Sequence, residues 1–174
     1  MMTRRTFSLF TTTALLFGTT AQGQTREFPI TKSNQEWKDL LTPAQHAVLR
    51  NHRTERAFTN SLMGERSPLL DNNRSGTYIC AGCENPLYLS STKYDSRTGW
   101  PSFWDAIEKS VGTTTDRRFF MTRTEVHCAQ CGGHLGHIFN DGPEPTGQRH
   151  CINGLALLFL PQGENTPTGH PVAH

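Results

Sequence analysis

The sequence predicts a mainly β fold in one domain, opened by two short helices. Its length of 174 residues fits one ordinary globular domain with appendages. From about Gly76 onwards, segments rich in Thr, Tyr, Val, Ile and Phe alternate with Gly, Pro, Asn and Asp, which is typical of strands joined by turns. The predicted strands of this mainly antiparallel sheet or small barrel are residues 76–80, 86–90, 118–128, 134–139 and 150–160.

Two helix-start signatures precede the strands. Ser33 is followed by Glu36 before the segment EWKDLL, and Thr42-Pro43 is followed by Gln45 before AQHAVLR. In each, a hydroxyl can accept from free backbone N–H groups of the first turn, and proline is well tolerated at the first helical position. Two short helices are therefore expected to open the domain.

Residues 1–23 resemble an export signal peptide of the twin-arginine type. The run TRRTFSL has a paired arginine followed one residue later by Phe, and the apolar stretch after it is too short and too rich in Thr to anchor in a membrane. An ordinary secretory signal is the alternative. Cleavage after Ala21 and cleavage after Gly23 both fit the small residues at its end. Either way, we expect the protein to be periplasmic or otherwise exported.

The charge balance excludes partners that bind through electrostatics alone. The chain has 17 Lys and Arg against 15 Asp and Glu, and the two arginines of the signal account for the whole excess. Nucleic-acid and membrane-surface binders need a concentrated basic face, so neither class is expected. We place the domain at residues 24–161 and a flexible tail at 162–174, where apolar periodicity is lacking.

Four of the five cysteines predict a metal site. Cys80 and Cys83 form one C-x-x-C pair, and Cys128 and Cys131 form another. Two such turns can present a tetrahedral shell of four thiolates, as expected for structural zinc, so one Zn²⁺ per chain is predicted. The alternatives are two structural disulfides, which an exported protein allows, and a redox disulfide in one pair, which lacks the βαβ context of thioredoxin-like motifs.

The fifth cysteine is a candidate nucleophile. Cys151 lies two residues after Arg149, on the same face if the segment is extended, where a positive charge favours the thiolate. His134, His137 and Asn140 lie upstream in HLGHIFN and can supply acids or hydrogen-bond donors to an oxygen atom. The alternative is a buried free cysteine with no chemical role.

The segment GWPSFW is a candidate aromatic wall. Trp100, Phe103 and Trp104 lie close together in a turn with Gly and Pro. Aromatic rings accept an apolar group such as a methyl next to sulfur. A cluster of core aromatics is the alternative.

Together these motifs resemble the methionine sulfoxide reductase B family. The resemblance runs from about Ser33 to Pro161 and includes both C-x-x-C pairs, GWPSFW, RTEVHCAQCGGHLGHIFNDGP and RHCINGLALLF in family order. It implies a compact two-sheet antiparallel β fold, of the Mss4-like or β-tent type, with short N-terminal helices and a structural zinc site.

The resemblance also implies an activity, reduction of the R epimer of methionine sulfoxide in oxidised proteins. Cys151 would be the nucleophile, and His134, His137, Asn140 and Arg149 would surround the sulfoxide oxygen and the thiolate. Trp100, with Phe103 beside it, would receive the substrate methyl group, and Asn153 would orient the cysteine loop. The implied partners are oxidised protein substrates and a thioredoxin-like or other thiol reductant, and we expect a monomer.

One departure from the family pattern concerns recycling. Many members carry a second cysteine just before the GWPSF turn, where this chain has Thr98. An external thiol is therefore expected to reduce Cys151. Two other classes of function remain at this point: a non-catalytic zinc-stabilised β binding module, and a Cys-His hydrolase.

Overall fold

The computed structural model describes residues 27–117 and 121–164. The predicted signal peptide, residues 118–120 of a predicted strand and most of the predicted tail lie outside these residues. No helix in the described part of the chain is long and apolar enough to cross a membrane. The elements are α1 (Asn34–Leu40), α2 (Pro43–Leu49), β1 (Ser61–Leu62), β2 (Glu65–Arg66), β3 (Gly76–Cys80), β4 (Pro86–Leu89), η1 (Ser90–Thr92), β5 (Lys93–Tyr94), β6 (Ser102–Phe103), β7 (Val111–Asp116), β8 (Arg123–Cys128), β9 (His134–Phe139), β10 (Arg149–Ile152), η2 (Gly154–Ala156) and β11 (Leu157–Pro161).

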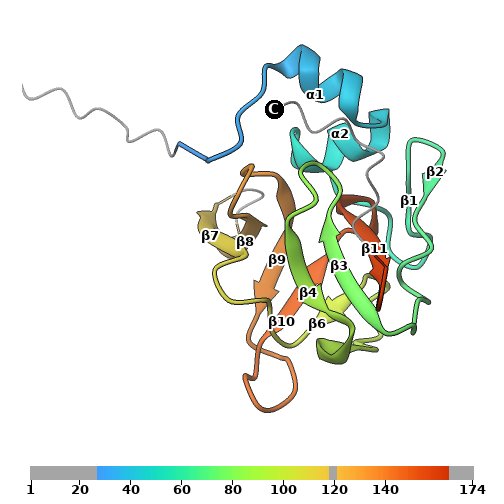
Figure 1. The fold of residues 1–174 in the computed structure, drawn as a ribbon. Coiled ribbons are helices and arrows are strands. Elements are labelled where there is room, and N and C mark those ends of the chain that lie inside the picture. The colour runs from blue at the N-terminus through green and yellow to red at the C-terminus, as the bar shows by residue number, and fades with distance from the viewer. Residues whose placement is uncertain (1–26, 118–120, 165–174) are drawn as a thin grey trace, which may run out of the picture.

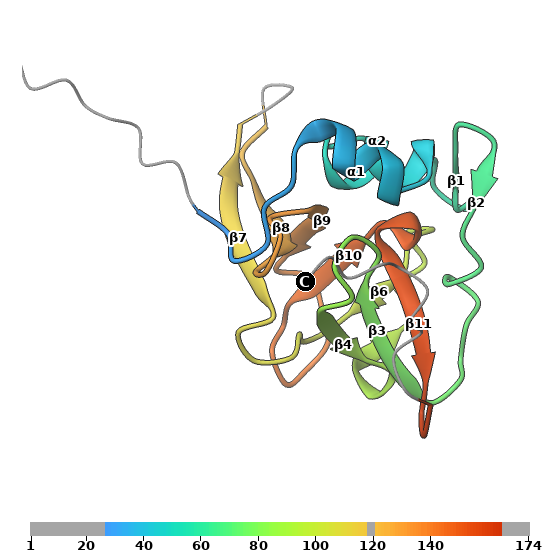
Figure 2. The ribbon, with the colours of Figure 1, turned by 45° about the horizontal axis from the view of Figure 1, so that its top comes forward.

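Both predicted helices are confirmed with their caps. In α1, the Ser33 hydroxyl accepts from the Glu36 N–H while the Glu36 carboxylate accepts from the Ser33 N–H. In α2, Thr42 and Gln45 form the same reciprocal pair, and Pro43 is the first helical residue. The two helices lie together at one end of the molecule, over the sheets (Figures 1 and 2).

The strands form two main antiparallel sheets, which confirms the mainly β, two-sheet prediction. A six-stranded sheet has the order β5-β6-β10-β9-β8-β7, and a three-stranded sheet has the order β11-β3-β4. A separate hairpin, β1-β2, lies at the side of the molecule (Figure 2). The strand β10, which carries Cys151, is therefore an interior strand of the larger sheet.

The predicted strand at 150–160 is wrong in its continuity. The structure divides it at Asn153 into β10 and β11, which belong to different sheets, with the 3₁₀ turn η2 between them. Both the backbone N–H and the side-chain Nδ2 of Asn153 donate to the Leu135 carbonyl, at 2.9 Å each. These bonds hold the chain where it leaves one sheet for the other.

Two other strand predictions change. The strand predicted at 118–128 is confirmed only from Arg123, and β7, a Thr-rich strand over 111–116, was not predicted. It is the edge strand of the six-stranded sheet, where several of its side chains face solvent. An exposed edge needs little apolar alternation, so the hydrophobic pattern gave no signal.

The core lies between the sheets and is built around aromatic rings. Tyr88 stacks on Phe103 with ring centroids 4.3 Å apart, and Tyr78 meets Phe103 edge-on at 5.0 Å. All three side chains are fully buried. Phe103 thus belongs to the core, the alternative considered for the GWPSFW segment. Val48 and Leu49 of α2 close one end of this core.

Candidate active site and metal centre

The four paired cysteines meet at the junction of the two sheets. Cys80 ends β3 of the three-stranded sheet and Cys128 ends β8 of the six-stranded sheet; Cys83 and Cys131 follow them in tight turns. The Sγ atoms of Cys80 and Cys131 are 3.8 Å apart, those of Cys83 and Cys128 are 3.5 Å apart, and all four lie within 4.8 Å of one another. The cluster therefore joins the two sheets.

These sulfur separations fit a tetrahedral metal shell. Four sulfurs about 2.3 Å from a zinc ion lie about 3.8 Å from each other, whereas disulfide sulfurs are about 2.05 Å apart. The Gly82 N–H donates to Cys80 Sγ at 3.4 Å and Asn85 Nδ2 donates to Cys128 Sγ at 3.5 Å, as expected around metal-bound thiolates. The four residues can hold a metal ion.

Cys151 lies in a small pocket away from this cluster. On β10 it faces Ser102 of β6 on one side and His137 of β9 on the other. None of the five cysteines is joined to another by a disulfide bond. The pocket has a volume of about 100 Å³ and is lined by Thr54, Trp100, Arg123, Gly136, His137, Phe139, Cys151 and Asn153.

Hydroxyl groups line the other side of the Cys151 sulfur. Thr98 Oγ1 is 4.0 Å from Cys151 Sγ. Ser96 Oγ lies within hydrogen-bond distance of both Thr98 Oγ1, at 2.8 Å, and Ser102 Oγ, at 2.7 Å. Thr98 is thus in contact with the candidate nucleophile and offers it a hydroxyl group.

Burial and charge act in opposite directions on Cys151. Burial raises the pKa of its thiol, while the Arg149 guanidinium and the Thr98 hydroxyl lower it; the net pKa is raised above the ordinary value for cysteine. The predicted effect of Arg149 is therefore present, but desolvation outweighs it.

The raised pKa predicts a distinct alkylation profile. Because only the thiolate reacts, the rate at which iodoacetamide modifies Cys151 should keep increasing beyond pH about 8.5, the usual midpoint for cysteine. Replacing Arg149 with Gln should move the midpoint higher still, while replacing the distant Arg66 with Gln should leave it unchanged. Peptide mass spectrometry measures the Cys151 rate separately; a midpoint below 8.5 in the wild type would contradict this account.

Arg149 is fixed by two neighbours. Its Nε and Nη2 donate to the two carboxylate oxygens of Asp141, at 2.8 and 2.9 Å. Its guanidinium lies over the Phe139 ring, 4.3 Å from the centroid. A bidentate pair and a ring contact hold the charge in one place beside the pocket. Asn140, between these neighbours, is exposed and does not line the pocket.

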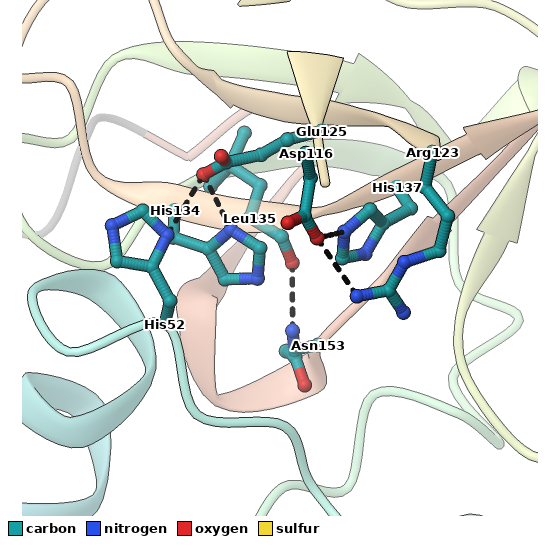
Figure 3. Close-up of polar contacts among 8 residues, drawn as sticks. All are labelled: His52, Asp116, Arg123, Glu125, His134, Leu135, His137 and Asn153. Carbon is teal, nitrogen blue, oxygen red and sulfur yellow. Dashed lines mark hydrogen bonds and ion pairs between the residues drawn. The ribbon is translucent and has the colours of Figure 1, made fainter. Parts of the chain in front are cut away.

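His137 reaches the pocket from β9 and is held by a carboxylate. Its Nε2 lies 2.8 Å from Asp116 Oδ2, which also accepts from Arg123 Nη2 at 2.7 Å (Figure 3). Since a carboxylate only accepts, His137 carries a proton on Nε2. Burial lowers the pKa of His137, and the hydrogen bond to Asp116 offsets this only in part. At neutral pH the ring is accordingly uncharged.

His134 lies behind His137 and does not line the pocket. It is 2% exposed, and its ring meets the His137 ring edge-on with centroids 5.5 Å apart. Its Nδ1 lies 2.7 Å from Glu125 Oε1, and His52 Nδ1 lies 3.0 Å from the same oxygen (Figure 3). Burial alone would raise the pKa of Glu125, but the hydrogen bonds from the two histidines hold it well below its usual range.

Glu55, which was not predicted as a site residue, connects two walls of the pocket. Its carboxylate accepts from the Gly154 N–H at 3.0 Å and from the Leu155 N–H. Its backbone N–H donates to Asn153 Oδ1 at 3.0 Å, and its carbonyl accepts from Trp100 Nε1 at 3.2 Å. Glu55 is 2% exposed. No pattern in the sequence marks it; only its burial in the fold does.

A Glu55→Gln variant should be less stable and less active. The two carboxylate oxygens of Glu55 accept from the N–H groups of Gly154 and Leu155. In glutamine an NH₂ group takes the place of one of these oxygens and would face a backbone N–H, which then loses its acceptor. Leaving one buried donor unpaired costs about 1–3 kcal/mol. We expect the free energy of unfolding to fall by that amount in urea titrations. Glu108→Gln, an exposed position, is the matched control. Unchanged stability in both variants would show that these hydrogen bonds contribute nothing.

Of the eight predicted active-site residues, half line one pocket in the structure. They are Cys151, His137, Trp100 and Asn153. Arg149 acts on Cys151 from its edge, His134 lies one ring behind, Asn140 is exposed, and Phe103 is in the core.

Fold and site together define a class of antiparallel β proteins in which four cysteines join two sheets and a separate cysteine shares a pocket with Trp and His. The SelR domain model matches residues 41–161, most of the chain. The chain therefore belongs to the SelR family, the methionine sulfoxide reductase B family.

Relatives across bacteria and archaea carry the same name, "Peptide methionine sulfoxide reductase MsrB". The protein of that name from Agrobacterium fabrum is 46% identical over 133 residues, 76% of this chain and 93% of the relative. The one from Methanosarcina mazei is 50% identical over 131 residues, 75% and 89% of the two chains. The one from Bradyrhizobium diazoefficiens is 48% identical over 143 residues, 82% and 98% of the two chains.

Proposed function

We propose that this protein reduces the R epimer of methionine sulfoxide in oxidised proteins to methionine, as a peptide-methionine (R)-S-oxide reductase. The observation that carries the proposal is the pocket that joins Cys151 to Trp100 and His137, in a chain whose relatives are named for this reaction. A free thiol, an aromatic surface and a nitrogen donor are the groups that reduction of a methyl sulfoxide requires.

The reaction begins at Cys151. Its thiolate attacks the sulfoxide sulfur while one proton reaches the oxygen, which gives an intermediate with a bond between the two sulfur atoms. The hydroxyl group then passes from the methionine sulfur to the Cys151 sulfur, the bond between the two sulfur atoms breaks, and methionine leaves with that electron pair. The oxygen remains on the cysteine as a sulfenic acid, the reversible first stage of thiol oxidation.

Pocket residues orient the substrate and the oxygen. The Trp100 ring packs against the substrate methyl group, and its Nε1 bond to the Glu55 carbonyl fixes the ring. His137, held by Asp116 through Nε2, presents its other ring nitrogen to the pocket, where it can position a water molecule that protonates the oxygen. Arg149 stabilises the thiolate, Asn153 fixes the loop after it, and His134 supports the His137 ring from behind.

Recycling uses an external thiol, either a thioredoxin-like protein or a small thiol. Thr98 contacts Cys151 but cannot form a disulfide, and the other four cysteines form the metal cluster. A thiol therefore condenses with the sulfenic acid, releasing water and leaving a mixed disulfide, and a second thiol restores Cys151.

Mass spectrometry after one turnover without reductant tests this recycling route. We expect Cys151 to carry one added oxygen. When dimedone, a reagent that traps sulfenic acids, is present, Cys151 should carry the dimedone adduct. The other four cysteines should be unchanged. The Thr98→Cys variant is the contrast, and should form a disulfide with Cys151. An intramolecular Cys151 disulfide in the wild type would contradict the route and the intact cluster together.

The cluster of Cys80, Cys83, Cys128 and Cys131 holds one structural Zn²⁺ per chain in this proposal. Four thiolates with closed tetrahedral geometry suit zinc and leave no position for a substrate. The ion supplies cross-linking of the two sheets and takes no part in the reaction.

The protein acts on residues in polypeptides, as a monomer. Trp100 also lines a second, larger pocket of about 610 Å³, with Phe58, Tyr94 and Arg97 among the lining residues. A peptide can extend from the Cys151 pocket across Trp100 into this one. The signal at residues 1–23 directs the 24–161 domain out of the cytoplasm to the periplasm, where it repairs proteins under oxidative stress.

An epimer-resolved assay tests the function. A peptide carrying both methionine sulfoxide epimers, with dithiothreitol as reductant, should lose its R epimer while the S epimer persists. Consumption of neither epimer would reject the reductase and leave the binding module, and equal loss of both would reject the stereochemistry.

A further inference from the structure

Three side chains from separate segments converge beside the active site. His52 lies in the loop after α2, Glu125 on β8 and His134 at the start of β9. The Nδ1 atoms of both histidines face the same Glu125 oxygen, at 3.0 and 2.7 Å, and the two rings have centroids 4.9 Å apart. Both rings point toward the carboxylate (Figure 3).

We propose that His52, Glu125 and His134 form a second metal site, separate from the cysteine cluster, that takes a transition-metal dication such as Zn²⁺ or Ni²⁺. One ligand atom from each residue lies within 4.8 Å of the others, as a shared ion requires. Two imidazoles and one carboxylate suit Zn²⁺, Ni²⁺, Cu²⁺ and Fe²⁺, whereas Mg²⁺ and Ca²⁺ prefer oxygen ligands.

The three residues differ in burial: His134 and Glu125 are held in the interior, whereas His52 is accessible to solvent. The exposed fraction falls from 36% for the His52 side chain to 13% for Glu125 and 2% for His134. An ion can enter at His52 and meet a fixed imidazole and carboxylate below it. With three protein ligands, the remaining coordination positions fall to water.

The charges and proton positions also allow an ion. Glu125 is held ionised, so it offers a negative charge to a cation. The Nε2 atom of His134 is buried and has no hydrogen-bond partner within the described residues. The His134 proton lies on Nδ1, where it bonds Glu125. An ion that takes the place of this proton at Nδ1 leaves the ring proton on Nε2, where no hydrogen-bond partner within the described residues opposes it.

Occupancy would affect the active site through His134. A metal on Nδ1 replaces the hydrogen bond to Glu125 and fixes a ring that packs against His137. We therefore expect bound ion to slow sulfoxide reduction, a consequence that rests on the proposed function; the binding itself does not.

Nickel uptake by zinc-loaded protein tests the site. The protein with its cysteine cluster filled should bind about one Ni²⁺ per chain in calorimetry while elemental analysis shows the zinc retained. Absorption from thiolate-to-nickel charge transfer should be absent. His52→Ala should abolish nickel binding and keep the zinc; because His52 is exposed, its fold should survive. No uptake by the wild type, or uptake by His52→Ala with unchanged affinity, would overturn the site.

Two control variants separate this site from other ligands. His170 and His174 lie outside the described residues, and the double variant His170→Ala/His174→Ala should still bind nickel. Cys151→Ser should bind it as well. If the double histidine variant failed to bind nickel, the ion would be bound by the tail. If Cys151→Ser failed to bind it, the ion would be bound by the nucleophile. Either result would overturn the proposal.

The activity measurement is made separately. Nickel should inhibit the wild type and spare His52→Ala, whose activity without nickel should match the wild type. Binding without inhibition would overturn the coupling through His134. A wild type inactive without added metal would count against the proposed function and leave the binding result unaffected.

Discussion

Cys151→Ser is expected to abolish sulfoxide reduction while leaving the fold intact. Serine keeps the size of the side chain but is a far weaker nucleophile at neutral pH, so turnover should fall by about three orders of magnitude or more. Initial rates with a methionine sulfoxide peptide and dithiothreitol measure the loss. Because Cys151 lies outside the metal cluster, the melting temperature and zinc content should match the wild type.

Thr98→Ser is the matched control for this prediction. It changes the side chain whose hydroxyl lies 4.0 Å from Cys151 Sγ, and it keeps that hydroxyl. Its turnover should remain within a few-fold of the wild type. If Cys151→Ser retained substantial turnover, a different group would have to be the nucleophile.

Loss of the cysteine cluster is expected to unfold the domain. Structural zinc in small domains contributes about 10–16 kcal/mol of apparent binding free energy at neutral pH, while whole domains are stable by about 5–15 kcal/mol. Removing the metal with a strong chelator, or replacing Cys131 with Ser, should therefore leave no cooperative melting transition. Circular dichroism follows the transition, and zinc should restore it in the chelated wild type.

A thiol count provides the independent check. Native protein should expose Cys151 alone to a thiol reagent, and chelated protein should expose all five cysteines. Cys151→Ser is the matched variant, since it removes a cysteine outside the cluster and should keep its melting transition. A chelated protein that melted like the native one would show that the sheets hold together without the ion.

Local signals in the sequence predicted much of this fold. The capping pairs at Ser33 and Thr42 marked both helices, and strand propensity marked β3 and β9 at their observed bounds. The prediction of one continuous strand over residues 150–160 was wrong, because nothing in this apolar segment indicates that the chain changes sheets at Asn153. That change depends on the Leu135 carbonyl, which is distant in sequence, so no local pattern could reveal it.

The site was predictable where chemistry depends on residue type. Cysteine spacing marked the metal cluster, and the isolated cysteine near Arg149 marked the pocket. Glu55, Glu125 and Asp116 were missed because carboxylates are common and usually exposed. Their importance comes from burial and from partners on other strands, which only the assembled sheets determine.

The interior position of β10 determines the order of events at Cys151. Neighbouring strands cover both edges of β10, and His150 and Ile152, which point to the opposite face, are buried. In the part of the chain that the structure describes, Cys151 lines this pocket, so substrate and reductant should use the same opening and methionine should depart before a reductant enters. Kinetics should be ping-pong, with parallel double-reciprocal lines, and high substrate concentrations should compete with the reductant.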